Sequence, residues 1–476
     1  MSVDSLIRNL RNIMRQDQGV AGDGQRIEQL GWMLFLKLYD DQEKFYELRD
    51  SKYKSPIPEK LRWRNWAGDP EGITGDDLRD FVNNDLFPGL KNLQVTADNK
   101  KSFVVRDAFE DAYNYMKSGT TMRRVLNELN QYDFNKTTDR HLINDFYEKL
   151  LKDLQNAGDY GEFYTPRPLT QFVVEMVDPK LGEVVFDPAC GTGGFLVNTL
   201  EHVRFHYVKN TADEKKLHDS IRGVELKQLP HLLASTNMII HGVEVPDNIR
   251  HDDSLSKPLT EYGPKDRVDV IFANPPFGGV VKEGADKNFP KDLRSNDTAD
   301  LFLILFIHLL KNGGRAGIVL PDGTLFGEGA KTRIKEKLLT ECNVHTIVRL
   351  PQGVFNPYAG VNTNLVFFEK GRPTKEVWYY KLPLPEGLRQ YTKNRGITSD
   401  EFEPVRKWWK KREENEYAWK VTIDEIKEKN FNLDFKNPNG KGDIEYKSPE
   451  EILKTIKDKE IKIQKLLGEI EGKFGD

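Results

Sequence analysis

Apolar side chains recur every three or four residues in the first part of the chain, beginning with Leu6, Leu10, Ile13 and Met14. The segments 31–41 and 141–155 carry the same helical pattern of apolar positions. The two tryptophans of LRWRNW (61–66) fall between these segments, and we interpret them as core residues, with contact to DNA or a partner as the alternative. The pattern predicts a helical N-terminal domain over residues 1–157.

Beyond residue 158, short apolar runs of strand length alternate with segments of helical spacing. We expect strands at 184–189, 221–226, 268–274, 314–321, 344–351 and 364–370. Alternating strands and helices are typical of an α/β fold with a doubly wound, mostly parallel sheet, and we assign it to residues 158–372. The apolar run 301–310 is too short to cross a bilayer and predicts a buried helix.

The chain becomes polar after residue 372, with scattered aromatic residues such as those of KWWKKREENEYAW (407–419). We interpret 373–443 as an extension and linker that ends in the breaker-rich stretch 436–443. Residues 444–476 predict a helix with a short coiled-coil seam: Leu453, Ile456, Ile463, Leu467, Ile470 and Phe474. Because so short a seam is marginal alone, we expect this helix to dock on a partner helix.

Composition and net charge restrict the classes of protein to which this chain can belong. The formal net charge of −4 is unfavourable for DNA binding by the whole surface, so contact with nucleic acid needs a local basic group or a partner. Two cysteines far apart in 476 residues predict neither a disulfide framework nor a zinc site, and we expect no metal. The first twenty residues lack the apolar core of a signal peptide, which indicates a cytoplasmic protein without membrane contact.

FDPACGTGGFL (186–196) joins the first predicted strand to a helix. Gly191, Gly193 and Gly194 allow a tight turn and close approach of a ligand, while Asp187 at the strand end offers a hydrogen-bond acceptor. The glycines do not match the dinucleotide pattern G-x-G-x-x-G, and the chain has no phosphate-binding G-x-x-x-x-G-K-[ST] motif. The turn therefore predicts a nucleoside-like ligand without a phosphate grip, with a simple packing turn as the alternative.

Two further acidic positions follow, one at the end of the second predicted strand and one before the predicted strand at 268–274. Glu225, in RGVELK, is placed to accept both hydroxyls of a ribose. Asp253, in HDDSL, is either an acceptor for the amino group of an adenine or a solvated turn residue. A glycine turn and a ribose-binding carboxylate without a phosphate grip fit S-adenosylmethionine (AdoMet), which carries a ribose and a sulfonium but no phosphate.

GDYGEFYTPRPLTQFVVEMV (158–177) contains a helix start. Thr165 is a good N-cap and Pro166 suits the first helical position. Phe163 and Tyr164 precede the cap, and they either pack structurally or close over the methionine end of AdoMet. The residues alone do not decide between these interpretations.

FANPPFGG (272–279) follows a predicted strand, at the sheet edge where α/β proteins bind ligands. The exocyclic amine of adenine is a weak nucleophile, and acceptors for both of its N–H groups favour a pyramidal nitrogen. The side-chain oxygen of Asn274 and the carbonyl of Pro275 are candidate acceptors, held by the fixed φ of Pro275 and Pro276. Phe277 can stack on a base flipped out of the duplex.

These motifs resemble, in order, those of N6-adenine DNA methyltransferases, and the whole chain resembles the modification subunit of type I restriction–modification systems. GEFYTP together with DPACGTGGFL carries most of this specificity, because protein and RNA methyltransferases also contain NPPF. By the resemblance, these residues bind cofactor: Gly161, Glu162, Phe163, Tyr164, Thr165, Pro166, Asp187, Gly191, Thr192, Gly193, Gly194 and Glu225. It makes Asn274, Pro275, Pro276 and Phe277 the catalytic loop.

The resemblance also implies partners. We expect AdoMet-dependent methylation of adenine N6 in duplex DNA, with the target sequence read by a separate specificity subunit that assembles with two copies of this chain. The helical domain would cover the DNA, and the C-terminal helix would dock on the specificity subunit or the second copy. A restriction subunit with nuclease and translocase activity is left open. The alternatives are a protein or RNA methyltransferase, an inactive assembly subunit that binds AdoMet, and a DNA scaffold.

Overall fold

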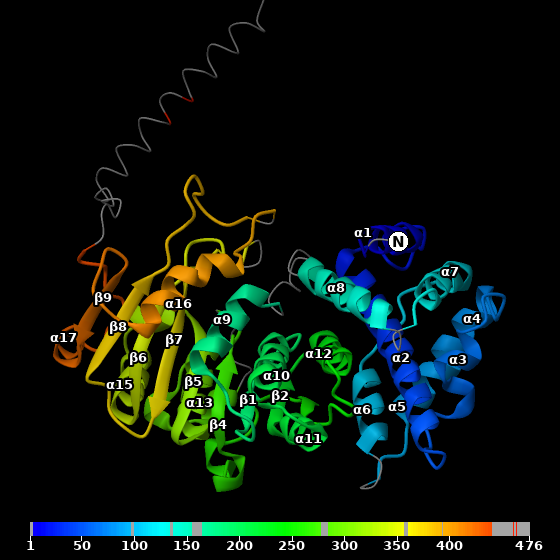
Figure 1. Ribbon diagram of the computed structural model, residues 1–476, viewed down its shortest axis with the longest axis horizontal. Helices are drawn as coiled ribbons and strands as arrows, with labels where there is room; N and C mark the ends of the chain where they lie inside the picture. Colours follow the sequence, from blue (N-terminus) through cyan, green and yellow to red (C-terminus); the bar gives the residue numbers. More distant parts are fainter. Residues whose placement is uncertain are drawn as a thin grey trace, which may run out of the picture.

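The computed structural model describes residues 3–96, 100–133, 137–154, 164–277, 284–356, 360–392 and 394–439, with residues 460 and 463. Helices fill the N-terminal part: α1 (Val3–Met14), α2 (Asp23–Arg49), α3 (Trp63–Trp66), α4 (Gly75–Phe81), α5 (Phe87–Lys91), α6 (Lys100–Phe109), α7 (Gly119–Asn130) and α8 (Thr137–Leu154). This group lies at one side of a large sheet with helices on both faces (Figure 1). The predicted helical character of the N-terminal region is therefore confirmed.

Within the described residues, nine strands form the sheet, in the order β3-β2-β1-β4-β5-β7-β6-β8-β9. They are β1 (Val185–Asp187), β2 (Ile221–Glu225), β3 (Ile249–His251), β4 (Val268–Ala273), β5 (Leu310–Pro321), β6 (Cys342–Arg349), β7 (Thr363–Lys370), β8 (Glu376–Lys381) and β9 (Ala418–Thr422). The neighbouring strands β3, β2, β1, β4 and β5 are all parallel, whereas β7 is antiparallel to both β5 and β6. The fold is therefore α/β with a doubly wound sheet, as expected.

The helices of the sheet region are α9 (Arg167–Val177), α10 (Gly194–Tyr207), α11 (Thr211–Ser220), α12 (Gln228–Ile240), α13 (Thr298–Leu309), α14 (Asp322–Phe326), α15 (Ala330–Glu341), α16 (Glu403–Lys410) and α17 (Ile423–Glu428). Alternate residues of β4 face opposite layers. Phe272 packs in the cluster of α9 and α16, and Ile271 packs in the cluster of α13 and α15. Both faces of the central strands are thus buried, which explains their continuous apolar sequence.

Three features differ from the sequence interpretation. The segment after residue 372, expected to be an extension and linker, adds β8 and β9 to the same sheet. Strand β3 was not predicted because its three residues are too short for a periodicity signal. Helix α9 begins at Arg167 with Pro166 as its N-cap, so Thr165 lies outside the helix rather than capping it. The expected C-terminal coiled-coil helix falls outside the described residues.

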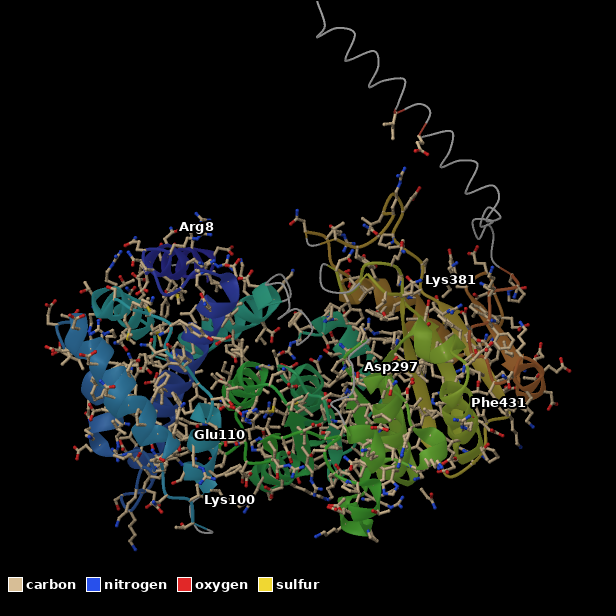
Figure 2. The ribbon with its side chains drawn as sticks, turned by 180° about the vertical axis from the view of Figure 1, so that it is seen from behind. Arg8, Lys100, Glu110, Asp297, Lys381 and Phe431 are labelled. Atoms are coloured by element: carbon tan, nitrogen blue, oxygen red, sulfur yellow. The ribbon has the colours of Figure 1, made fainter. Side chains whose placement is uncertain are left out.

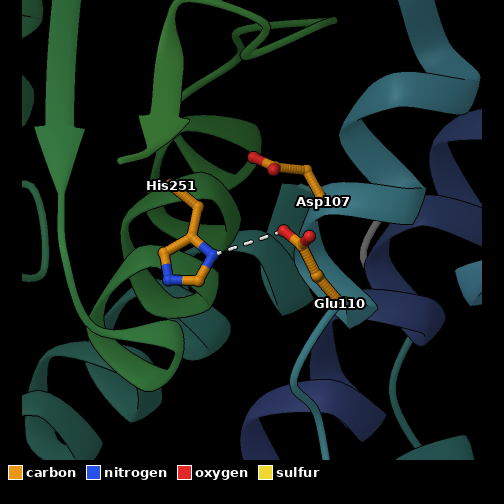
Figure 3. Close-up of side chains that lie close together, drawn as sticks. All are labelled: Asp107, Glu110 and His251. Carbon is orange, nitrogen blue, oxygen red and sulfur yellow. Dashed lines mark ion pairs between the residues drawn. The ribbon is translucent and has the colours of Figure 1, made fainter. Parts of the chain in front are cut away.

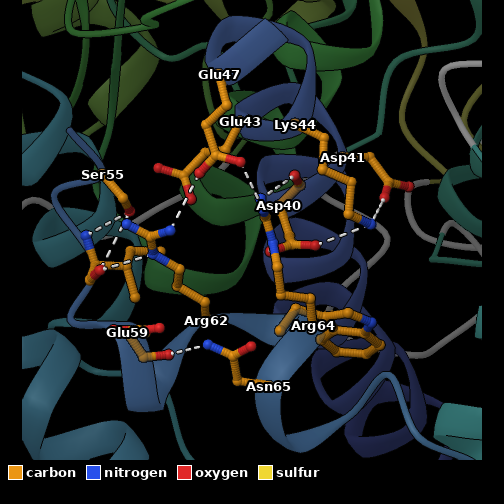
Figure 4. A network of polar contacts seen from close by, with 12 residues as sticks. Asp40, Asp41, Glu43, Lys44, Glu47, Ser55, Glu59, Arg62, Arg64 and Asn65 are labelled. Atoms are coloured by element: carbon orange, nitrogen blue, oxygen red, sulfur yellow. Dashed lines mark hydrogen bonds and ion pairs between the residues drawn. The ribbon is translucent and has the colours of Figure 1, made fainter. Parts of the chain in front are cut away.

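A polar network fixes α3 and the turn before it against α2 (Figure 4). Arg64 donates to Asp40 Oδ1 at 2.7 Å and to Glu47 Oε2 at 2.6 Å, and Arg62 donates to Glu47 Oε1 at 3.1 Å. Asp40 is only 2% exposed, so these charge-assisted bonds compensate for its burial. Trp63 and Trp66 are buried beside this network, which confirms their interpretation as core residues.

Helix α12 joins the helical domain to the sheet. Leu229, Leu232 and Leu233 belong to the apolar core of the helical domain, whereas Ala234 and Met238 on the same helix pack against α10. The hydroxyl of Tyr147, from α8, donates to the Leu233 carbonyl at 2.7 Å. Because α12 follows β2 directly, the helical domain lies beside the part of the sheet that holds β2 (Figure 1).

Both ends of α6 also reach the outer edge of the sheet. Lys100 lies at one end of α6 and Glu110 directly after the other (Figure 2). Lys100 pairs with Asp247 at 2.6 Å. Glu110 faces His251 Nδ1 at 3.6 Å (Figure 3). His251 Nε2 donates to the Leu226 carbonyl at 3.0 Å. These contacts cover the edge strand β3, whose exposed backbone groups would otherwise invite pairing with another chain. None of the described helices is both long enough and apolar enough to cross a membrane.

Candidate active site

A pocket of about 350 Å³ opens at the carboxyl ends of β1, β2, β3 and β4. Strands β1 and β4 are neighbours although their crossovers run to opposite sides, which is the place where open α/β sheets bind ligands. The size falls within the range of small-molecule sites, roughly 300–1,000 Å³. Its lining comes from each strand end and from α13: Pro188, Ala189, Glu225, Leu226, Lys227, Asp252, Asp253, Ser254, Leu255, Pro276, Ala285, Thr298 and Phe302.

The glycine turn between β1 and α10 borders this pocket. Gly191 and Gly193 have φ angles of +53° and +79°, which L-residues with a side chain adopt only with strain. The Gly191 amide donates to Glu225 Oε2 at 2.9 Å, so the turn is tied to the end of β2. Thr192 is buried and its carbonyl accepts a hydrogen bond from the side chain of Asn237, on α12, at 2.9 Å.

Asp187 lies beneath the turn rather than in the pocket lining. Its side chain is buried and accepts the Ala189 amide at 3.1 Å. Burial raises the pKa of Asp187 well above its ordinary value, the Ala189 amide opposes this shift, and the charge of Glu225 adds to it. In this arrangement Asp187 shapes the turn that borders the pocket.

Glu225 and Asp253 both line the pocket, as the sequence predicts. Glu225 Oε1 accepts the Lys227 amide at 2.8 Å, which holds the carboxylate at the strand end. Asp253 Oδ1 accepts the Leu255 amide at 2.9 Å, so this residue stabilises a turn and also lines the pocket. Leu226, which is 55% exposed, and Phe302 supply apolar surface beside these carboxylates.

Asn274 lies at the end of β4 and contacts a residue 109 positions earlier. Its side-chain nitrogen donates to the hydroxyl of Thr165 at 3.0 Å. Its Oδ1 atom is buried and has no hydrogen-bond partner among the described residues. Leaving a buried acceptor unpaired costs roughly 1–3 kcal/mol, which is tolerated where a ligand supplies the missing donor. Thr165 thus fixes the orientation of the amide, and the buried Oδ1 is the end that has no partner among the described residues.

The loop after Asn274 is held on two sides. The Pro276 carbonyl accepts the hydroxyl of Thr298, at the start of α13, at 3.1 Å. Phe277 is partly buried and packs edge-to-face on Phe355, with ring centroids 5.5 Å apart. Pro275 is buried beneath the loop. These contacts bring the expected catalytic loop beside the expected cofactor pocket.

Tyr164 points away from this pocket. It is 7% exposed, packs in the core of the helical domain, and lines a separate cavity of about 140 Å³ with Pro166 and Val354. Burial and the nearby Glu148 raise the pKa of Tyr164 to about 12, although Arg167 opposes them. The expected cofactor residues Gly161, Glu162 and Phe163 fall outside the described residues.

Sequence reasoning missed several residues that the fold brings to the site. Thr298, Phe302 and Phe355 contribute from α13 and from the loop after β6. The Arg167 guanidinium lies between Glu148, on α8, and the Gly194 carbonyl, which it reaches at 3.0 Å. Only Arg167 could have been found from the sequence, because it lies within the GEFYTPR stretch. Thr298, Phe302 and Phe355 reach the site through tertiary packing.

Family models match almost the whole chain. The model described as N-6 DNA Methylase matches residues 138–447, and the HsdM N-terminal domain matches residues 3–129. The chain belongs to the N-6 DNA methylase family. The first match to end, that of the HsdM N-terminal domain, stops within α7, and the N-6 DNA Methylase match begins at the start of α8, so the boundary lies between these two helices.

Known proteins are similar to this chain along almost its full length. The chain is 53% identical to the EcoEI type I restriction enzyme methylase subunit of Escherichia coli, covering 100% of this chain and 98% of that protein. A solved modification subunit from Vibrio vulnificus YJ016 is 42% identical with a TM-score of 0.82, covering 92% and 97%. A solved type I restriction–modification system contains a chain 36% identical with a TM-score of 0.83, covering 98% and 96%.

Proposed function

We propose that this methylase transfers a methyl group from AdoMet to the N6 amine of an adenine in duplex DNA. It acts as the modification subunit of a cytoplasmic type I restriction–modification complex. The observation that carries the proposal is the buried, unpaired Oδ1 of Asn274, whose amide nitrogen is held by Thr165. This geometry leaves an acceptor for an incoming N–H group, and adenine N6 has two.

The cofactor pocket supports AdoMet through the chemistry of its lining. Glu225 offers a carboxylate to ribose hydroxyls, Asp253 offers one to an adenine amine, and Leu226 with Phe302 offers apolar surface to a base. The acidic lining suits a cationic sulfonium and opposes a phosphate. When bound, AdoMet supplies an electrophilic methyl group, so the protein needs no metal or covalent nucleophile for the transfer.

The residues of the loop would prepare the amine for attack. Asn274 Oδ1 and the Pro275 carbonyl accept the two N–H groups and direct the nitrogen lone pair toward the methyl group. Thr298 holds the loop through the Pro276 carbonyl. Phe277 supplies an aromatic surface for the flipped base, where stacking contributes roughly 1–3 kcal/mol. In the present packing Phe277 contacts Phe355, so both rings belong to the wall that a base would meet.

The family and the net charge of the chain both indicate which partner subunits it needs. A net charge of −4 is poor for independent DNA binding, so a specificity subunit reads the target sequence. Two copies of this chain assemble with it, and the helical domain covers the DNA. A restriction subunit completes systems that also cleave DNA.

The test is transfer of labelled methyl from AdoMet to genomic DNA from a host that lacks the system. The assay compares the chain alone, the chain with its co-expressed specificity subunit, and the same complex with Asn274→Ala. We expect label on adenine N6 only with the specificity subunit. The Asn274→Ala variant should lose at least about a hundredfold in rate, because it removes an acceptor that acts in the transition state.

The outcomes separate the alternatives. Label from the chain alone would show that it contains its own recognition element. AdoMet binding without any label on DNA would contradict the proposal and favour a protein or RNA substrate. Retention of full activity by Asn274→Ala would contradict the role of the amide oxygen.

A further inference from the structure

Arg167 connects the helical domain to the glycine turn of the cofactor pocket. Its Nε donates to both carboxylate oxygens of Glu148, on α8, at 2.9 and 2.8 Å, and its Nη2 also contacts this carboxylate. Its Nη1 donates to the Gly194 carbonyl at 3.0 Å. One planar guanidinium therefore bridges a side chain of the helical domain and the backbone at the first residue of α10.

The environment makes this bridge specific. The Arg167 side chain is 18% exposed and that of Glu148 is 35% exposed, so water competes only partly for these donors. Because Glu148 occupies the Nε and Nη2 side of the guanidinium, the remaining Nη1 edge is fixed in direction. Without Glu148 the guanidinium would keep its charge but lose the contact that orients it toward Gly194.

A second hydrogen bond to the glycine turn comes from α12, which also packs against the helical domain. Asn237 is fully buried on α12 and donates to the Thr192 carbonyl at 2.9 Å. Helix α12 itself packs in the core of the helical domain through Leu232 and Leu233. The carbonyls of Thr192 and Gly194, at two positions of the turn, are thus held by residues whose placement depends on the docked helical domain.

We propose that Arg167 is a positioning residue that makes the affinity of the glycine turn for AdoMet depend on the docking of helix α8. The inference rests on the proposed function, since it takes AdoMet as the ligand of this turn. The docked position of α8 holds the guanidinium, which holds the Gly194 carbonyl and the start of α10. Linkage requires the reverse as well, so AdoMet binding favours the docked position of α8.

The experiment measures AdoMet affinity of the full-length chain by isothermal titration calorimetry, without DNA or turnover. Glu148→Gln removes the charge from the bridge but keeps the size of the side chain. Asp153→Asn is the matched control, because Asp153 also lies on α8 and pairs with an arginine, Arg11, but that arginine belongs to α1 in the helical domain. Melting temperatures of both variants report any general loss of stability.

We expect Glu148→Gln to weaken AdoMet binding about tenfold, the size of one charge-assisted bond, and Asp153→Asn to stay within about twofold. Arg167→Gln should weaken binding to a similar extent. In the double variant Glu148→Gln/Arg167→Gln the loss should be no greater than in Arg167→Gln alone, because both substitutions interrupt the same bridge.

The contrary results are distinct. Equal AdoMet affinity of Glu148→Gln and Asp153→Asn would overturn the coupling while leaving the proposed function intact. Losses that multiply in the double variant would also overturn it, because Glu148 would then act independently of Arg167. Failure of the wild-type chain to bind AdoMet would overturn the proposed function and, with it, this inference.

Discussion

Asn274 illustrates how one side chain is given a direction by a residue far away in the sequence. The amide has a donor end and an acceptor end of nearly the same size, and only the acceptor suits the N–H groups of adenine. Thr165 accepts from the donor end at 3.0 Å, which leaves the buried Oδ1 for the substrate. The sequence places both residues in motifs but assigns Thr165 to cofactor binding and helix capping.

Substituting Thr165 separates these roles. Thr165→Val removes the hydroxyl with little change in shape, whereas Thr165→Ser keeps it. If Thr165 orients Asn274, the single-turnover methylation rate at saturating AdoMet falls about tenfold or more in Thr165→Val and is largely retained in Thr165→Ser. An unchanged rate at saturation together with a raised dissociation constant for AdoMet would instead assign Thr165 to cofactor binding.

Among the elements, α9 has a position that close packing against the sheet restricts. It begins at Arg167, two residues after Thr165, and packs closely over β5. At Gly317 of β5, an added Cβ would lie 2.6 Å from Val173 Cγ1 and 2.9 Å from Val177 Cγ2. Valine side chains are stiff and cannot turn aside. The glycine therefore sets the distance between α9 and the sheet, and with it the position of Thr165.

Gly317→Ala should consequently lower the free energy of unfolding by about 1–3 kcal/mol, as overpacked cores do. Urea denaturation measures this loss, and Gly323→Ala is the control because a Cβ at Gly323 meets no described heavy atom within 4 Å. Adding Val173→Ala to Gly317→Ala should recover part of the stability by making room. No difference between Gly317→Ala and Gly323→Ala would show that α9 adjusts freely.

At the scale of the whole molecule, two half-buried histidines, His241 and His345, link stability to pH. Burial, followed by the charges of Arg167 and Arg204, lowers the pKa of His241 to about 3. Burial, followed by Arg412 and Arg372, lowers the pKa of His345 to about 3. In the unfolded chain both titrate near pH 6.5, so below that pH the unfolded state binds more protons than the folded state. Their contribution to stability is therefore complete above about pH 6.5 and is lost as the pH falls toward 3.

The variant His345→Gln tests this link between histidine protonation and stability. Glutamine keeps an acceptor for Arg412, which contacts His345 Nδ1 at 3.3 Å in the wild-type chain. Between pH 7.5 and 5.5 the wild-type chain should lose about 1 kcal/mol more in free energy of unfolding than this variant. Denaturant titrations at both pH values give the difference. The same pH dependence in both proteins would mean that His345 accepts a proton in the folded state.

The sequence by itself determined the features that depend on local order along the chain. Periodicity located the helical domain and the central strands, because burial on one face or on both leaves a regular apolar pattern. The sequence also placed Glu225 and Asn274 at strand ends, and parallel strands bring such ends to one edge.

The tertiary structure alone decided what depends on contacts between distant segments. Strand β3 and the outer strands β8 and β9 take their identity from neighbours, since their own pattern is too short or too polar to predict them. The partner of Asn274 lies 109 residues away, and the partners of Arg167 lie on two different helices. A hydrogen bond of this kind leaves no periodic trace, because one residue on each side suffices to make it.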